Sequence, residues 1–211
     1  MTAQVPISFL RNGPADAATT LVLAHGAGAA MDTPFLESIA GQVAQASIQV
    51  VRFEFPYMAK RREDGKNRPP DRQPVLLDYW RKVVAALEDT RLFIGGKSMG
   101  GRMASMVADE VKAAGLVCLG YPFHPLGKPE RLRIEHLQEI KTPTLILQGE
   151  RDGFGHRQEV VDYPLAKTVQ LQWLTDGDHS FRPRKAAEVS ETQNLAEAAQ
   201  AIVAFLQKKQ A

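Results

Sequence analysis

The feature that most constrains the fold is a short apolar run that leads into glycines around one serine. Residues 92–94 are apolar, and Gly95-Gly96-Lys97-Ser98-Met99-Gly100-Gly101 follows them. The pattern predicts a strand, a sharp turn and a helix, which lifts the serine side chain clear of the sheet. Gly96 and Gly100 lack Cβ atoms and let two chain segments approach closely around Ser98. Ser98 would then stand at the N-terminus of a helix, where free N–H groups and the helix dipole favour negative charge.

The glycine motifs of the chain allow three other interpretations. Gly96-Lys97-Ser98 resembles the end of a phosphate-binding P-loop, but Arg91 stands where that loop needs a glycine. Gly26-x-Gly28 after a strand resembles a dinucleotide fingerprint, but Met31 replaces its third small residue. An ordinary Gly-Ser turn is the third alternative. The sequence therefore favours neither nucleotide nor nicotinamide binding, and we expect no cofactor.

Length and charge set further bounds. The 211 residues suit a single domain, residues 1–211, with a core of its own. A net charge of +2 gives no electrostatic reason to expect nucleic acid as a partner. Cys118 is the only cysteine and lies in the apolar run 116–119. We expect it to be a buried structural thiol and not a nucleophile.

The sequence also suggests where the protein acts. Residues 1–6 contain no basic segment followed by an apolar one, so no secretory signal is expected. No apolar run approaches the length needed to cross a membrane. We expect a cytoplasmic protein that does not bind membranes, and the oligomeric state stays open.

Apolar runs and helical patterns alternate along the chain, which predicts an α/β fold. The predicted strands are Val5–Leu10, Thr19–Ala24, Ile48–Phe53, Leu92–Ile94, Leu116–Leu119, Thr142–Leu147 and Val169–Leu174. Helices are predicted after Asp32 or Thr33, around 76–87, from Ser98 to Gly115, and from Ser190 with a capping box to Gln193. This order is typical of a mostly parallel, doubly wound sheet with helices on both faces.

The segment from Glu54 to Pro74 is predicted to be long and irregular, and it is rich in basic residues. One interpretation is a solvated, mobile loop. The other is a rim that recognises anions through Arg61, Arg62 and Arg68, because the preceding strand should end at the functional edge of the sheet.

Special residues follow several predicted strands directly. They are Gly26, Ser98, Tyr121, Asp152 and His179. Because function in such sheets collects at the carboxyl ends of the strands, these residues should lie near one another.

These residue types together fit nucleophilic catalysis. A serine hydroxyl needs a base, histidine suits that role near neutral pH, and a carboxylate fixes the histidine tautomer. We expect Ser98 to be the nucleophile, His179 the base and Asp152 the acid, an order along the chain that matches the α/β-hydrolase arrangement. Asp176 and Asp178 are rival acids, but they are expected to shape the loop of His179.

An oxyanion would need two backbone donors. We expect the N–H groups of Met99 and Ala27 to supply them. The remaining histidines show no zinc-ligand spacing with nearby Cys, Asp or Glu, so we expect no metal site. These are His25, His124, His136 and His156, and all four are expected to be structural or on the surface, with His25 orienting the oxyanion loop.

Taken together, the chain resembles the α/β-hydrolase fold over nearly its whole length. The motifs that carry the resemblance are His25-Gly26-Ala27-Gly28, Gly96-Lys97-Ser98-Met99-Gly100-Gly101, Gln148-Gly149-Glu150-Arg151-Asp152 and Gly177-Asp178-His179-Ser180-Phe181. Two further stretches resemble a small, dienelactone-hydrolase-like branch that includes a testis-expressed protein and a regulatory subunit of the non-specific-lethal chromatin complex. They are Phe53-Glu54-Phe55-Pro56-Tyr57 and Gly120-Tyr121-Pro122-Phe123-His124-Pro125.

The resemblance implies a serine hydrolase of the carboxylesterase type that uses no cofactor. His-Gly-Ala-Gly replaces the His-Gly-Gly-Gly of many lipases, which argues against a lipase. About twenty residues separate the strands of Cys118 and Leu145, where the family usually inserts a lid, so we expect no large lid. Without a lid, the expected substrate is a small or exposed ester. The residues that we assign to substrate binding are Gly26, Tyr57, Tyr121, Phe123 and Phe154.

Two functions are compatible with these residues. One is hydrolysis of a small-molecule carboxylic ester, thioester or lactone. The other is an interaction module that kept the fold and lost efficient catalysis, as the resemblance to a chromatin-complex subunit suggests. Fold alone does not decide between them.

Overall fold

One seven-stranded sheet forms the centre of the computed structural model, which describes residues 7–87 and 91–208. The strand order is β1-β3-β2-β4-β5-β6-β7. The strands are β1 Phe9–Asn12, β2 Thr20–Ala24, β3 Gln49–Phe53, β4 Leu92–Lys97, β5 Gly115–Leu119, β6 Thr144–Gly149 and β7 Val169–Leu174. Only β1 is antiparallel to its neighbour, and the other pairs are parallel. The expected doubly wound α/β-hydrolase sheet is therefore confirmed.

The central strands are buried along their length, as their continuous apolar sequences predict. All five residues of β2, β3 and β5 are buried, and so are all six of β6. Each face of the sheet carries its own apolar core. The sheet is thus enclosed between two layers, and polar side chains gather beyond the ends of its strands.

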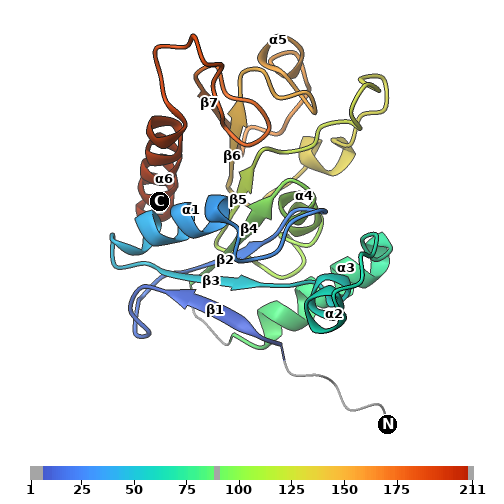
Figure 1. Ribbon diagram of the computed structural model, residues 1–211, viewed down its shortest axis with the longest axis vertical. Helices are drawn as coiled ribbons and strands as arrows, with labels where there is room; N and C mark the ends of the chain where they lie inside the picture. The colour runs from blue at the N-terminus through green and yellow to red at the C-terminus, as the bar shows by residue number, and fades with distance from the viewer. Residues whose placement is uncertain (1–6, 88–90, 209–211) are drawn as a thin grey trace.

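Helices cover both faces (Figure 1). On one face lie α1 Pro34–Ala44 and α6 Glu191–Gln207, which bury residues such as Ile39 and Ile202. On the other face lie α3 Gln73–Ala85 and α4 Met99–Ser105, with Trp80 and Met103 in the core. A capping box begins α6, where Ser190 accepts a hydrogen bond from the Gln193 N–H and the Gln193 side chain accepts one from Ser190 N–H. This start was predicted from the sequence.

The basic segment is not wholly irregular, which corrects the prediction for Glu54–Pro74. Residues Pro56–Asp64 form helix α2, with proline in its first turn and Gly65 in the left-handed conformation at its end. Only Tyr57 and Met58 of this helix are buried. Because most of its residues are charged, α2 has no apolar stripe by which sequence periodicity could reveal it.

The predicted end of the helix after Ser98 and the predicted first strand also differ from the structure. Helix α4 ends at Ser105, and turns follow it, whereas the apolar residues up to Val111 predicted a longer helix. Gly115 does not end a helix but begins β5. The first strand is Phe9–Asn12, later than the predicted Val5–Leu10, of which residues 5 and 6 lie outside the described residues. Apolar side chains in turns pack against the core as well as helical ones do, so the pattern did not reveal where the helix stops.

The connections after β5 and β6, at the end where a lid would enter, carry only short helical elements. Between β5 and β6 the chain contains one short 3₁₀ helix, η1 Glu135–Gln138, and turns. A second short element, α5 Arg157–Val160, lies between β6 and β7. Within the described residues no lid domain is inserted, as expected. None of the helices in the described ranges is both long and apolar enough to cross a membrane.

The Ser190 cap offers a test of local stability. Replacing Ser190 by alanine removes the acceptor for the Gln193 N–H and should lower the free energy of unfolding by about 1 kcal/mol. Ser190→Asp keeps an acceptor at the same place and should retain most of the stability. Urea denaturation of both variants measures the difference, and equal losses in the two would contradict the capping role.

Candidate active site

The backbone of Ser98 is held in a left-handed conformation, with φ 51° and ψ −117°. A residue with a Cβ rarely adopts this conformation, and it persists only where its surroundings enforce it. Ser98 N–H donates to Leu119 O at 2.9 Å, and Ser98 O accepts from Arg102 N–H at 3.0 Å. A Cβ on Gly100 would lie 2.5 Å from His25 O, so only glycine fits there. The predicted sharp turn between β4 and α4 is present.

Ser98 meets His179 and Asp152 although the three are far apart in sequence. His179 Nε2 lies 2.9 Å from Ser98 Oγ, and His179 Nδ1 lies 2.7 Å from Asp152 Oδ2. Because a carboxylate only accepts, Nδ1 carries the hydrogen and Nε2 accepts from the serine hydroxyl. The imidazole is therefore in the tautomer that can take the serine proton.

Asp152 is completely buried, so its charge depends on hydrogen bonds. Its Oδ2 accepts from Gln148 Nε2 at 2.9 Å as well as from His179, and its Oδ1 accepts from Phe154 N–H at 2.9 Å. Gln148 also accepts from Tyr121 N–H at 2.7 Å and donates to Tyr121 O and Gly155 O. This amide joins the ends of β5 and β6 to the acid.

Sequence reasoning did not assign a role to Gln148. The available signal was a single long polar side chain at the end of the buried apolar strand β6, where an unpaired amide would be costly.

The rival acids have other partners. Asp176 pairs with Arg151 at 2.9 Å and with Arg184 at 2.6 Å. Asp178 Oδ1 accepts from the N–H groups of Ser180 and Arg182. Both carboxylates thus shape the loop that carries His179, as the sequence suggested.

His25 and Tyr57 hold the loop after β2 through hydrogen bonds to its backbone. His25 Nδ1 donates to Gly26 O at 2.7 Å, and its Nε2 accepts from Phe55 N–H at 3.1 Å, while burial lowers the pKa of His25 and favours this neutral form. Tyr57 donates its hydroxyl hydrogen to Ala27 O at 2.8 Å, and burial raises the pKa of this hydroxyl. Ala27 itself is exposed beside the site. Met99 is the first residue of α4, where a helix leaves N–H groups without partners of its own.

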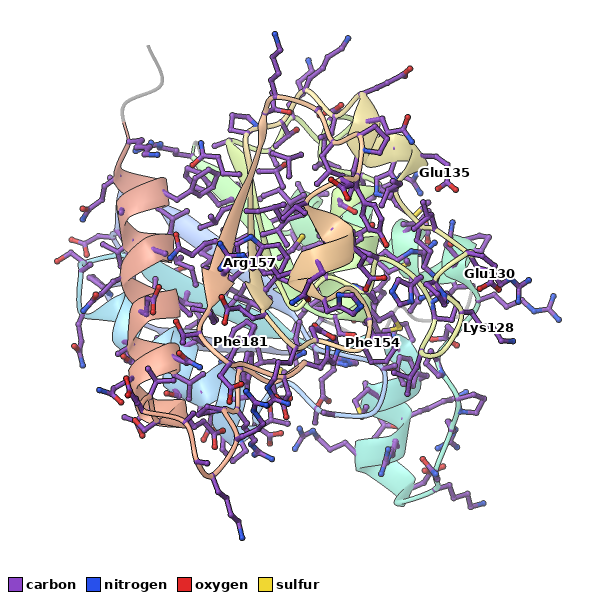
Figure 2. All side chains as sticks on the ribbon, turned by 90° about the horizontal axis from the view of Figure 1, so that it is seen from above. Lys128, Glu130, Glu135, Phe154, Arg157 and Phe181 are labelled. Atoms are coloured by element: carbon purple, nitrogen blue, oxygen red, sulfur yellow. The ribbon has the colours of Figure 1, made fainter. Side chains whose placement is uncertain are left out.

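The residues predicted to bind substrate have different surroundings. Gly26 is buried beside Ser98, and a Cβ there would lie 3.7 Å from the Ser98 Cβ. Phe154 is partly exposed, and its ring lies 4.5 Å from the His179 ring. Figure 2 shows Phe154 near the middle of the view from above.

Tyr121, Phe123 and Tyr57 need correction as substrate contacts. Tyr121 and Phe123 are completely buried, with their rings 4.9 Å apart in the core, and the Tyr121 hydroxyl donates to Arg133 O. Their place after a strand suggested exposure at the sheet edge, but the chain turns inward there. Tyr57 is also buried, and its contact is with the Ala27 backbone.

A cleft of about 270 Å³ lies between the loop after β2 and helix α2. Its lining residues are Gly28, Ala30, Asp32, Glu54, Met58, Arg61 and Arg62. Arg62 is neutralised there, since it pairs with Glu54 at 2.6 Å and with Asp32 at 2.9 Å. Arg68 pairs with Asp64 instead, at 2.6 Å. Among the residues that the structure describes, Arg61 has no carboxylate within ion-pair distance.

Comparisons with known proteins agree with this architecture. The family model described as "Alpha/beta hydrolase domain" matches residues 17–207. The chain belongs to the α/β-hydrolase family.

Several solved α/β hydrolases share the fold at low sequence identity. A serine hydrolase without lid from Xanthomonas campestris has a TM-score of 0.73 and 17% identity, covering 97% of this chain and 91% of that one. A dienelactone hydrolase from Anabaena variabilis has a TM-score of 0.71 and 18% identity, covering 97% and 93%. A serine hydrolase homologue from Coxiella burnetii has a TM-score of 0.69 and 18% identity, covering 94% and 89%.

The other histidines and the cysteine of this α/β hydrolase lie apart from the Ser98 hydroxyl. His124 is buried between Pro125 O and Glu159, and His136 contacts the Ser105 hydroxyl. His156 is exposed at the start of α5. Cys118 is completely buried, and burial raises the pKa of its thiol, which leaves it unreactive.

Gln148 provides a test of the buried network in this α/β hydrolase. Gln148→Met removes the amide and leaves Tyr121 N–H and one oxygen of Asp152 short of a partner. We expect the free energy of unfolding to fall by about 2–4 kcal/mol.

The matched control is Gln158→Met, at an exposed position, which should change stability by less than about 0.5 kcal/mol. Chemical denaturation compares the two variants. A Gln148→Met protein as stable as the control would show that the network contributes little.

Proposed function

We propose that this chain is a serine hydrolase of the carboxylesterase type that cleaves a small or exposed carboxylic ester. The observation that carries the proposal is the chain of two hydrogen bonds from Ser98 Oγ through His179 to buried Asp152. The strained backbone of Ser98 at the start of α4 supports it further, since such a turn presents a nucleophile. Thioesters and lactones would use the same residues.

The proposed reaction has two halves. Ser98 Oγ attacks the carbonyl carbon of the ester while His179 Nε2 takes the hydroxyl proton. The N–H groups of Met99 and Ala27 hold the negative carbonyl oxygen. The bond to the alcohol then breaks, His179 gives its proton to the departing oxygen, and an acyl group stays on Ser98. Water attacks that acyl group in the same way, releasing the acid and restoring the serine.

Asp152 takes no proton in this proposal. It holds the His179 ring in one tautomer and stabilises the imidazolium that forms during each half. Phe154, packed on the imidazole, is proposed to form one wall of the substrate site, with Gly26 on the side of the oxyanion loop.

The connections after β5 and β6 carry only short helices in the described residues, which supports a substrate that needs no deep enclosure. We further infer, from the motifs around Phe53-Glu54-Phe55-Pro56-Tyr57 and Gly120-Tyr121-Pro122, that the chain belongs to the small branch named above. A cytoplasmic location and a small-molecule partner, without nucleic acid or membrane, complete the proposal.

Ser98→Ala tests the nucleophile. Turnover of 4-nitrophenyl acetate should fall by roughly three orders of magnitude or more, because the acyl-enzyme can no longer form. A fluorophosphonate probe should add to the wild-type protein and not to the variant, as measured by intact mass. Full ester turnover by Ser98→Ala would remove the assignment.

The interaction-module alternative predicts a different result. A folded wild-type protein that takes up no probe and hydrolyses none of a panel of esters and thioesters would favour that alternative. Circular dichroism on the same sample establishes that the protein is folded.

The anion-recognising rim, one of the two interpretations of the basic segment, reduces to Arg61, because Arg62 and Arg68 are already paired. Arg61→Gln should raise the KM for 4-nitrophenyl hydrogen glutarate about tenfold and leave its neutral methyl ester unaffected, since only the former carries a carboxylate. Arg68→Gln is the matched control. Equal effects of Arg61→Gln on both esters would rule out charge recognition at this residue.

A further inference from the structure

Lys97 links the strand of the serine to the loop of the histidine. It is the last residue of β4 and directly precedes Ser98. Its ammonium group donates to the backbone oxygen of His179 at 2.5 Å. The same loop is therefore contacted at two points, the imidazole by Ser98 and Asp152 and the backbone by Lys97.

The surroundings of the ammonium group are confined. It lies 5.5 Å from the centre of the Phe35 ring, on α1. Gly120, with φ 64°, lies beneath it, and a Cβ at this position would be 2.9 Å from both Lys97 Nζ and His179 O. A side chain at residue 120 would therefore displace the contact, which fits the glycine found there.

The charged groups that face Lys97 come from two neighbouring strand ends. Asp152, after β6, and Asp178, after β7, both attract its positive charge, and His179 accepts its hydrogen bond. Burial outweighs this attraction and lowers the pKa of Lys97 to about 8. The group thus changes charge in a range that enzymes experience.

We propose that Lys97 is a positioning residue, which holds the His179 backbone so that Nε2 stays within proton-transfer distance of Ser98 Oγ. This inference rests on the proposed serine hydrolase function. Asp152 and Ser98 hold the two ring nitrogens and Phe154 packs against the ring, but these contacts act on the side chain alone. The bond from Lys97 holds the backbone of the same residue, and it starts from the residue next to the nucleophile.

The proposal predicts a dependence on pH. A charged donor makes a stronger hydrogen bond than a neutral one, so loss of the Lys97 proton weakens the hold on His179. Reaction at Ser98 should therefore slow as the pH rises through about 8.

Stability should change in the opposite sense over that range. The folded pKa of Lys97 is about 8, below the 10.5 of an ordinary lysine, so between these values the unfolded chain binds the proton and the folded chain does not. Lys97 therefore disfavours folding at low pH and ceases to do so as pH rises through this window. If the reaction at Ser98 slows while the free energy of unfolding does not fall, the cause is lost positioning and not alkaline unfolding.

The experiment measures the rate at which a fluorophosphonate probe labels Ser98 between pH 6 and pH 10. Lys97→Met keeps most of the length of the side chain and removes the donor, and Lys97→Arg keeps a charge at every pH in the series. We expect Lys97→Met to label at least about tenfold more slowly than wild type at pH 7. We expect Lys97→Arg to restore most of the rate and to abolish the fall above pH 8. Exposed Lys167→Met is the matched control and should behave as wild type.

Each outcome decides a separate question. A wild-type protein that takes up no probe contradicts the proposed function itself. A labelled wild type with a Lys97→Met rate within twofold of it overturns the inference about Lys97 alone. If Lys97→Met does not fold, the wild-type and Lys97→Arg profiles decide, and the same alkaline fall in both overturns the inference. Denaturation of wild type and Lys97→Met should show their difference in unfolding free energy shifting in favour of wild type between about pH 8 and 10.5.

Discussion

The arrangement at the strand ends depends on one carboxylate that water does not reach. Asp152 is completely buried, and a charge in such a place is tolerated only when several donors face it. The three donors come from Gln148, the backbone of Phe154 and the ring of His179. Satisfying this charge therefore fixes the end of β6, the turn after it and the loop after β7 relative to one another.

The topology of the sheet explains how residues far apart in the sequence come together at one edge. Parallel strands bring their carboxyl ends to a common edge, and β4, β5, β6 and β7 are consecutive neighbours. Residues separated by dozens of positions thus arrive within hydrogen-bond distance of one another. The two apolar layers enclose the sheet, and the loops beyond the strand ends carry the polar residues that meet there.

Much of this was visible in the sequence because backbone requirements leave clear marks. Glycines around Ser98 indicated the sharp turn, and continuous apolar runs indicated buried parallel strands. The spacing of Ser98, Asp152 and His179 after strands indicated a common edge, and the three do meet. Ser190 and Gln193 indicated the start of α6 because a capping box is local.

The failures have equally physical causes. Helix α2 begins at Pro56, precedes Gly65 and pairs Arg62 with Glu54, but it has no apolar stripe, so hydrophobic periodicity gave no signal for it. The inward turn of Tyr121 and Phe123 depends on packing between distant segments. The roles of Gln148 and Lys97 depend on which backbone oxygen or carboxylate lies opposite, and only the assembled fold determines that.

The burial of Cys118 has a practical consequence. Cys118 lies on β5, its sulfur contacts the backbone oxygen of Gly101 in α4, and the residue has no exposed surface. As the sole thiol of the chain, it can meet an alkylating reagent only when β4, β5 and α4 come apart. The rate at which Cys118 is alkylated therefore measures how often the centre of the sheet opens, and the measurement needs no engineered label.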